Sequence, residues 1–199
     1  MKLMTIFYRL DNKLYINITN ACPCACVFCI RNTADGVGEA DSLWLTHEPT
    51  LEEVKIAFFQ NRKNLAEVDE IVFCGYGEPM CRAEDVVEIA TFIKLETNLP
   101  VRLNTNGLVK LINPGFDIAK LKVMDSISVS LNADDAEEYV RLCQPVFGAP
   151  AYAALLEFVK EVPVPTTLSV VGILQPHRIE NCKTLAKELG ALLRVRSCW

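Results

Sequence analysis

The chain has 199 residues, of which 51% are hydrophobic, and its formal net charge at pH 7 is −5. No run of Lys or Arg exceeds two residues, which argues against an extended nucleic-acid track, because phosphate binding needs clustered cations. Apolar runs are too short to span a bilayer, and the N-terminus lacks a signal-peptide pattern. Nine cysteines without a secretory signal favour metal or redox chemistry over a disulfide framework. We therefore expect one cytoplasmic domain, residues 1–199, without membrane contact.

The chain begins with a predicted β-hairpin, formed by residues 4–10 and 13–19 around a polar turn. In its second strand apolar and polar residues alternate, and this period of two predicts one buried and one polar face. A cysteine-rich segment, residues 22–29, follows the hairpin, and residues 31–49 form a polar connection.

The rest of the chain alternates between predicted helices and strands. Thr50 and Glu53 have the spacing of a capping box, which predicts that the first helix begins here. Gly190 stands where it can end the last helix. The remaining strands are predicted at 70–74, 101–104, 125–132, 167–173 and 192–196, and the remaining helices at 83–95, 116–121, 134–142, 151–159 and 179–189.

This alternation, repeated about six times, predicts parallel β–α–β units and an α/β fold. Six units are too few for a closed eight-stranded barrel of about 250 residues. An open, partial (β/α)6 barrel of the TIM type, with an N-terminal β-hairpin, fits the length. In such barrels reactive groups gather at the C-terminal ends of the strands. Polar or glycine-containing segments stand at four predicted strand ends, at residues 20–29, 75–79, 104–107 and 130–132.

Three of the cysteines in segment 22–29, Cys22, Cys26 and Cys29, have C-x3-C-x2-C spacing. Thiolates hold iron–sulfur clusters, normally one per iron, so three thiolates can leave one iron of a four-iron cluster open to a small molecule. A zinc site is the alternative, but structural zinc usually uses two separated cysteine pairs, and no second C-x2-C is present. A disulfide between cysteines so close in sequence would be strained.

The spacing, with the aromatic Phe28 just before the last cysteine, resembles the signature of the radical S-adenosylmethionine (SAM) enzymes. The surrounding sequence, LYINITNACPC and FCIR, is most similar to the small radical SAM proteins called TatD-linked. The resemblance implies a [4Fe–4S] cluster held by Cys22, Cys26 and Cys29, with SAM on the fourth iron and Phe28 near its adenine. By the family's spacing, Cys24 is not a ligand.

The same resemblance implies further SAM contacts at the strand ends. Gly77-Glu78-Pro79 can be a simple turn, but it is similar to the family's Gly-Gly-Glu-Pro element, which holds the amino group of SAM; Tyr76 stands where the first glycine is usual. The segment 104–107 can likewise be only a turn. In the predicted strand 125–132, Ser126, Ser128 and Ser130 place a row of hydroxyl groups on one face. Such a row is harder to explain as plain structure, because unpartnered hydroxyls are costly in a core. The implied contacts from these two strand ends are Asn104, Thr105, Asn106, Ser130 and Asn132.

The resemblance implies that a donor such as flavodoxin or ferredoxin reduces the cluster, that SAM is cleaved to a 5′-deoxyadenosyl radical, and that this radical abstracts hydrogen from a substrate. The substrate is left open: a small molecule, a nucleotide-like compound or a protein. In the last case the chain would be an activating enzyme that makes a glycyl radical on its partner. The non-enzymatic alternative is a zinc-stabilised binding module. Arg31 and Arg196 are candidates to meet an anionic substrate, because guanidinium matches carboxylate or phosphate geometry; Cys198 is a candidate hydrogen donor or second metal ligand.

Overall fold

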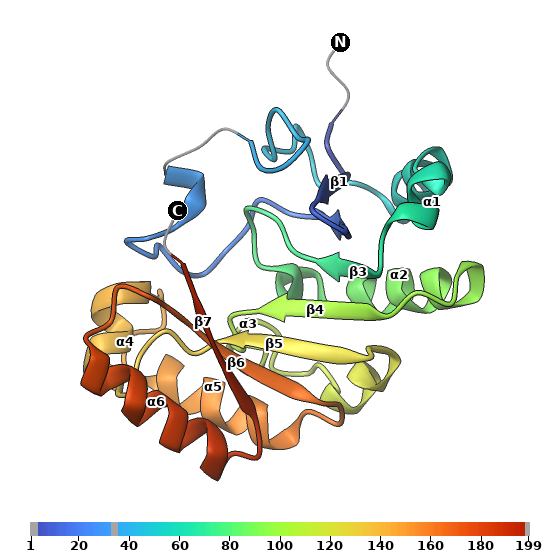
Figure 1. The fold of residues 1–199 in the computed structure, drawn as a ribbon. Coiled ribbons are helices and arrows are strands. Elements are labelled where there is room, and N and C mark those ends of the chain that lie inside the picture. Colours follow the sequence, from blue (N-terminus) through green and yellow to red (C-terminus); the bar gives the residue numbers. More distant parts are fainter. Residues whose placement is uncertain (1–3, 33–35, 198–199) are drawn as a thin grey trace.

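The computed structural model describes residues 4–32 and 36–197; Cys198, considered above, lies outside them. Its centre is a seven-stranded sheet whose strands follow in sequence order (Figure 1). The strands are β1 (Phe7–Leu10), β2 (Lys13–Ile16), β3 (Glu70–Phe73), β4 (Val101–Thr105), β5 (Ser126–Ser130), β6 (Thr166–Val171) and β7 (Leu192–Arg196). The α-helices are α1 (Leu51–Gln60), α2 (Ala83–Glu96), α3 (Val109–Ile112), α4 (Ala136–Cys143), α5 (Pro150–Glu161) and α6 (Pro176–Glu188). The 3-10 helices are η1 (Ile30–Asn32), η2 (Arg62–Glu67), η3 (Pro79–Arg82) and η4 (Ile118–Val123).

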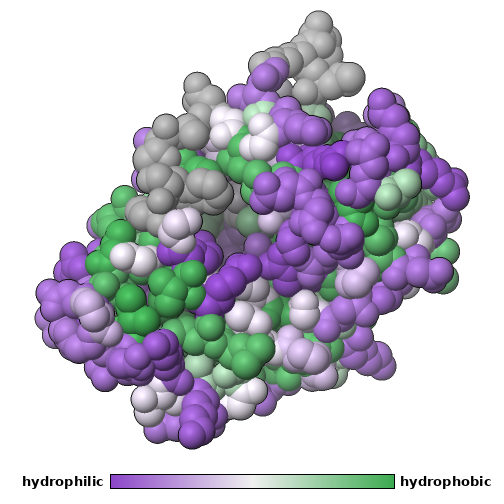
Figure 2. Space-filling model, viewed as in Figure 1, coloured by the Kyte–Doolittle hydropathy of each residue, from purple (hydrophilic) through white to green (hydrophobic). Residues whose placement is uncertain are grey.

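Strands β1 and β2 form an antiparallel pair, and every later neighbour is parallel. Each parallel connection passes through helical segments that return the chain to the next strand (Figure 1). The result is an open, partial (β/α)6 barrel preceded by a hairpin strand, as the alternation predicted. Figure 2 shows hydrophilic residues over the region of α1 and α2 and hydrophobic ones around the β7 edge, where Leu192 is 74% exposed and Val195 46%. None of the helices in the described part of the chain combines the length and apolar character that a bilayer span requires.

The alternation in β5 separates the helix-packed face of the sheet from the barrel interior. Ile127, Val129 and Leu131 are buried in the main apolar core together with Phe158 of α5. Because successive side chains of a strand point to opposite faces, the serines between them face the interior, as the sequence predicted. Polar groups on that side have one another as neighbours: Ser130 lies opposite Ser169 of β6 in the parallel register.

The predicted helix ends are confirmed at two places. The Thr50 hydroxyl accepts the Glu53 backbone N–H at 3.2 Å, and the Glu53 carboxylate accepts the Thr50 N–H at 2.8 Å, so both halves of the capping box form. Gly190 has φ +69° and follows α6. Its N–H donates to Lys187 O and the next N–H to Ala186 O, the pattern of a Schellman cap that favours glycine.

Other predicted boundaries were wrong. The hairpin strands are shorter than 4–10 and 13–19, because the chain leaves the sheet at Asn17, whose buried amide donates to Leu43 O at 2.7 Å and Thr5 O at 3.1 Å. The helix predicted at 116–121 is the 3-10 helix η4, which begins with the Asp117 carboxylate accepting the Ala119 N–H. The short helix α3 was not predicted.

Candidate functional site

The cysteine loop, residues 22–29, lies across the C-terminal end of the barrel. It is attached by backbone hydrogen bonds to the end of α4: Ala25 N–H donates to Cys143 O at 3.1 Å and Val27 N–H to Leu142 O at 2.9 Å. A third bond, from Val146 N–H to Pro23 O at 2.9 Å, fixes the start of the loop. The loop that follows β2 is therefore held in place by the segment that follows β5.

The three predicted ligands Cys22, Cys26 and Cys29 are half-buried thiols. Cys22 and Cys26 pack against the main apolar core, as does Phe28. Cys26 and Cys29 are joined by a turn, in which Cys29 N–H donates to Cys26 O at 3.1 Å. In the part of the chain that the structure describes, no His, Cys, Asp or Glu side chains converge as they would around a single ion. A four-iron cluster sets a different requirement, because each thiolate binds its own iron.

Electrostatics favours the thiolate at Cys26. Hydrogen bonds from the thiols of Cys143 and Cys24, together with the charge of Arg31, outweigh burial and lower the pKa of Cys26 to about 4. A hydrogen bond from Cys24 also lowers the pKa of Cys22, whereas burial raises that of Cys29. Since the thiolate is the form that binds metal, Cys26 is prepared for ligation before any metal arrives.

Cys24 is buried between two of these thiols. It donates hydrogen bonds to the sulfurs of Cys22 and Cys26, and this role raises its pKa strongly. It also receives a weak bond from the Asn106 amide, 3.8 Å from Nδ2 to Sγ. Arg31 braces the loop from outside, since its guanidinium donates to Cys24 O at 3.1 Å. Cys24 thus faces the ligand thiols but is protonated.

The turn after β3 packs directly on the start of the cysteine loop. A Cβ built on Gly77 would lie 2.3 Å from Thr19 O and 2.7 Å from Ala21 O, so only glycine allows the two backbones to approach this closely. Glu78 N–H donates to Ala21 O at 2.8 Å. These contacts bring the Gly77-Glu78 element, as predicted, against the loop that carries the cysteines.

Glu78 is a buried carboxylate, 5% exposed, that ties this turn to the end of β4. Its Oε1 accepts the Thr105 hydroxyl at 2.6 Å and the Met80 N–H at 3.0 Å, and its Oε2 accepts the Asn106 N–H at 2.7 Å. Burial raises its pKa to about 7, against the opposing effect of these hydrogen bonds. One side of Oε2 keeps an acceptor site, because each carboxylate oxygen can accept two bonds.

The other predicted residues lie at the same end of the barrel, with different partners. Asn104 Oδ1 accepts the Arg102 guanidinium at 2.6 Å. Asn132, at φ +56°, is buried; its Nδ2 donates to Cys143 Sγ at 3.5 Å, and its Oδ1 accepts Arg196 Nη2 at 3.1 Å. Both amide atoms of Asn132 therefore already have protein partners.

The sequence analysis did not single out Cys143. The residue is buried at the end of α4, but it contacts Cys26, 117 positions away in the chain: Cys26 Sγ lies 3.6 Å from its carbonyl oxygen, and its thiol also interacts with that sulfur. No local pattern around Cys143 indicates this contact. Only the three-dimensional arrangement, in which α4 is bonded to the cysteine loop, reveals it.

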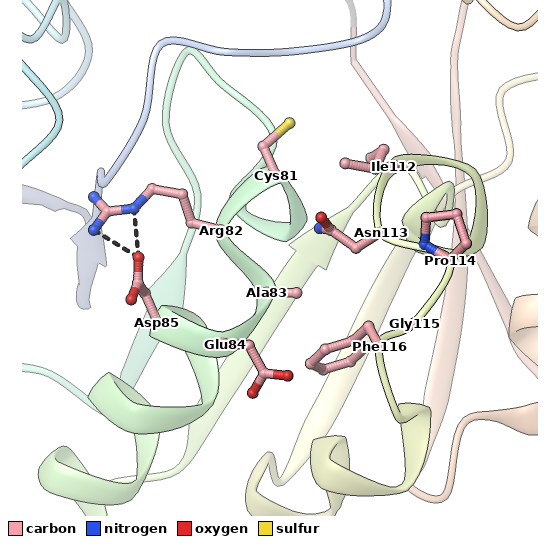
Figure 3. A pocket seen from close by; sticks show the side chains of 10 residues that line it. All are labelled: Cys81, Arg82, Ala83, Glu84, Asp85, Ile112, Asn113, Pro114, Gly115 and Phe116. Atoms are coloured by element: carbon pink, nitrogen blue, oxygen red, sulfur yellow. Dashed lines mark hydrogen bonds and ion pairs between the residues drawn. The ribbon is translucent and has the colours of Figure 1, made fainter.

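A separate cavity of about 500 Å³ opens between the start of α2 and the segment after α3. In Figure 3, Cys81 lies at one end of it, and Glu84 and Phe116 at the other. Its polar groups are engaged: Arg82 pairs with Asp85 at 2.7 Å, and the Asn113 amide donates to Met80 O at 2.8 Å. The cavity lies beside the cysteine loop but contains none of the predicted ligands.

The donor set at the barrel end fits a thiolate-bound cluster. Three half-buried thiols lie in one loop, one of them ionised at neutral pH, and the fourth cysteine of the loop is kept protonated. Next to them stand the Gly77 turn, packed on the backbone carbonyls of Thr19 and Ala21, and the Glu78 carboxylate, whose Oε2 accepts one described hydrogen bond, from the Asn106 N–H. These are groups that could meet the ammonium of a chelating ligand.

Comparison with known proteins agrees with this geometry. A family model described as the Radical SAM superfamily matches residues 16–185. A search of curated proteins found no match. Among solved structures, SuiB of Streptococcus suis bound to its precursor peptide SuiA is 16% identical with a TM-score of 0.69, over 97% of this chain and 40% of that one.

Two further solved structures share the fold. TYW1 with a lysine–pyruvate adduct bound is 15% identical with a TM-score of 0.62, covering 94% of this chain and 65% of that one. TsrM from Kitasatospora setae, with cobalamin and a [4Fe–4S] cluster bound, is 9% identical with a TM-score of 0.55, covering 94% and 36%. At these identities the likeness shows the fold, and this chain spans less than two thirds of the length of each of the three.

Proposed function

The chain belongs to the radical SAM superfamily, whose members use a [4Fe–4S] cluster and SAM, and we propose that it is a radical SAM enzyme whose cluster is held by Cys22, Cys26 and Cys29. Within the superfamily we propose the TatD-linked subgroup, on the sequence around the cysteines, and a single core domain over residues 1–199. The observation that carries the proposal is the direct bonding of three segments: Ala21 O, just before the cysteine loop, accepts the Glu78 N–H, and the Glu78 carboxylate accepts the Asn106 N–H.

When bound and reduced, the cluster supplies the electron that cleaves SAM to methionine and a 5′-deoxyadenosyl radical. The residues of this chain hold the reactants and keep competing hydrogen donors away. Cys26, ionised by its neighbours, offers the first thiolate. Cys24 stays protonated between two ligands and stabilises their negative charge by hydrogen bonding.

The SAM-binding residues proposed here surround the cysteine loop. Glu78 offers the free acceptor site of Oε2 to the ammonium group, while Thr105 and Asn106 fix its carboxylate. Phe28, within the loop, packs against the main apolar core and is the residue proposed to meet the adenine. The remaining proposed contacts are Gly77, Asn104, Thr105, Asn106, Ser130 and Asn132.

The electron donor is proposed to be a small redox protein such as a flavodoxin or ferredoxin, in the cytoplasm. The substrate is a small molecule, a nucleotide-like compound or a protein. To test the reaction, the protein is incubated in ordinary water with candidate substrates that carry deuterium. Transfer of deuterium into 5′-deoxyadenosine identifies the substrate and, if the donor is a protein glycine, the activating-enzyme alternative.

Metal analysis tests the proposal directly. Anaerobically purified protein should be brown and contain about four irons and four sulfides per chain, and with reductant it should cleave SAM. Cys26→Ala should lose iron and cleavage together. Cys182→Ala, which alters a buried thiol of α6, is the matched control and should retain both. A colourless protein with stoichiometric zinc would instead establish the binding-module alternative.

A further inference from the structure

Arg196 is the last residue of β7, and its guanidinium has no acidic partner among the residues that the structure describes. Its Nε is fully buried and has no hydrogen-bond partner, and its one described hydrogen bond runs from Nη2 to Asn132 Oδ1 at 3.1 Å. Within residues 4–32 and 36–197, no carboxylate lies within ion-pair distance of it. A buried donor of a charged group is costly when it is left unpaired. Within the described part of the chain, nothing compensates the charge of Arg196.

The other arginine of the barrel interior shows the contrast. Arg102 is 9% exposed, and its guanidinium binds both oxygens of Glu70, at 3.1 Å and 3.0 Å. Arg196 instead has as its electrostatic neighbours the thiols of Cys74, Cys26 and Cys143 and a second cation, Arg194. Arg194 and Arg196 are two residues apart on one strand and so share a face.

A chain of contacts fixes the Arg196 guanidinium relative to the cysteine loop. Arg196 bonds Asn132, Asn132 bonds Cys143 through Nδ2, and Cys143 bonds Cys26. Figure 1 shows the C-terminal end of β7 in the same region as the loop that precedes η1. A group bound to Arg196 would lie beside the proposed cluster, on the side of the barrel that β7 leaves open.

We propose that Arg196 binds an anionic group, a carboxylate or a phosphate, of the substrate of the radical reaction. A guanidinium matches the oxygens of such a group. Nη1 is not among the fully buried atoms and has no hydrogen-bond partner in the described part of the chain, so it can donate to the bound anion. Arg194 adds a second positive charge on the same strand face, and Asn132 acts as a positioning residue. The assignment rests on the proposed function above and specifies its substrate class.

Calorimetric titration tests the site without knowledge of the substrate. The probes are inorganic phosphate and acetate, added anaerobically to cluster-loaded protein saturated with SAM. The wild type should bind at least one of them. Arg196→Gln should weaken this binding about tenfold or more, because charge-assisted hydrogen bonds are lost. Arg62→Gln removes an equal charge from an exposed site and should leave binding unchanged; Arg196→Lys, which keeps the charge without the fork, should fall between the two.

Two other roles for Arg196 would overturn the proposal, and each has its own measurement. If Arg196 holds the carboxylate of SAM, Arg196→Gln should weaken the binding of SAM itself but not the binding of decarboxylated SAM. If it only compensates the charge of the ligand thiolates, the variant should shift the cluster's reduction potential and leave anion binding intact. Iron content and circular dichroism confirm that the variants fold; should Arg196→Gln fail to fold, the Arg196→Lys comparison carries the test.

The two proposals fail in different ways. A wild-type protein that holds no iron, or does not cleave SAM, would refute the proposed function. A wild-type protein that does both but binds neither phosphate nor acetate, or binds them equally well as Arg196→Gln, would refute only the assignment of Arg196.

Discussion

Glu78 should make the protein's stability depend on pH in a direction opposite to that of an ordinary carboxylate. Burial raises its pKa from 4.5 to about 7. A group whose pKa is higher in the folded than in the unfolded state stabilises the fold fully below pH 4.5, and this contribution is lost as the pH rises through about 7. At 1.36 kcal/mol per pKa unit the whole loss is about 3 kcal/mol, and most of it falls between pH 5 and pH 8. Because the side chain is only 5% exposed, solvent screening does not reduce this figure greatly.

The assay compares urea unfolding of cluster-free wild type and Glu78→Gln at pH 5 and pH 8. In the variant, the glutamine NH2 group faces one of the donors whose hydrogen bond Glu78 accepts in the wild type. The resulting loss of stability is the same at both pH values. Between pH 5 and pH 8 the stability difference between the two proteins should nevertheless move by most of that loss of ~3 kcal/mol in favour of the variant. Glu138→Gln is the control: hydrogen bonds from Arg141 lower the pKa of Glu138 below its usual value, so its stability difference should change little between pH 5 and pH 8.

A stability difference for Glu78→Gln that is the same at both pH values would refute the reasoning, because it would mean that the carboxyl is ionised throughout. The same titration bears on the ligand. If Glu78 receives the ammonium group of SAM, ionisation of the carboxyl favours binding, and the affinity for SAM should rise as the pH increases through about 7.

Three further predictions concern the scaffold of the site. Gly77→Ala places a Cβ 2.3 Å from a backbone carbonyl, so iron content after anaerobic reconstitution should fall well below the wild-type value; full loading would show that the two backbones can separate. Thr50→Ala removes the cap of α1 and should cost about 1 kcal/mol in urea unfolding, with no loss of iron. Arg102→Ala leaves the half-buried Glu70 paired only with Lys13 at 2.7 Å and should cost about 3 kcal/mol; an unchanged urea midpoint would contradict the ion-pair assignment.

The features that could be predicted from the sequence are those whose cause is local. The capping box at Thr50 and the Schellman cap at Gly190 depend on residues within a few positions of one another. The alternation in β5 depends on the two faces of a single strand. The cysteine spacing is likewise confined to eight residues, and the order of strands and helices then determined the fold class.

The contacts that tune the site could not be predicted in the same way. Cys143 lowers the pKa of Cys26 from 117 residues away, and Arg196 meets Asn132 across 64 residues. Nothing near Cys143 or Asn132 in the sequence specifies these partners. They follow from the packing of α4 against the cysteine loop and from the position of β7 in the sheet, which only the assembled barrel defines.

The two ends of the barrel differ in how their buried charges are paired. At the N-terminal ends of the strands, Lys13, Glu70 and Arg102 neutralise one another, and their hydrogen bonds outweigh burial to lower the pKa of Glu70. At the opposite end, and among the described residues, the buried carboxyl of Glu78 has no cationic partner and the guanidinium of Arg196 has no anionic one. If these two served only the fold, they would be expected to pair as the first three do, because unpaired buried charges are costly. Their separation is better explained by two bound molecules, one with a positive group for Glu78 and a second, the substrate, with a negative group for Arg196.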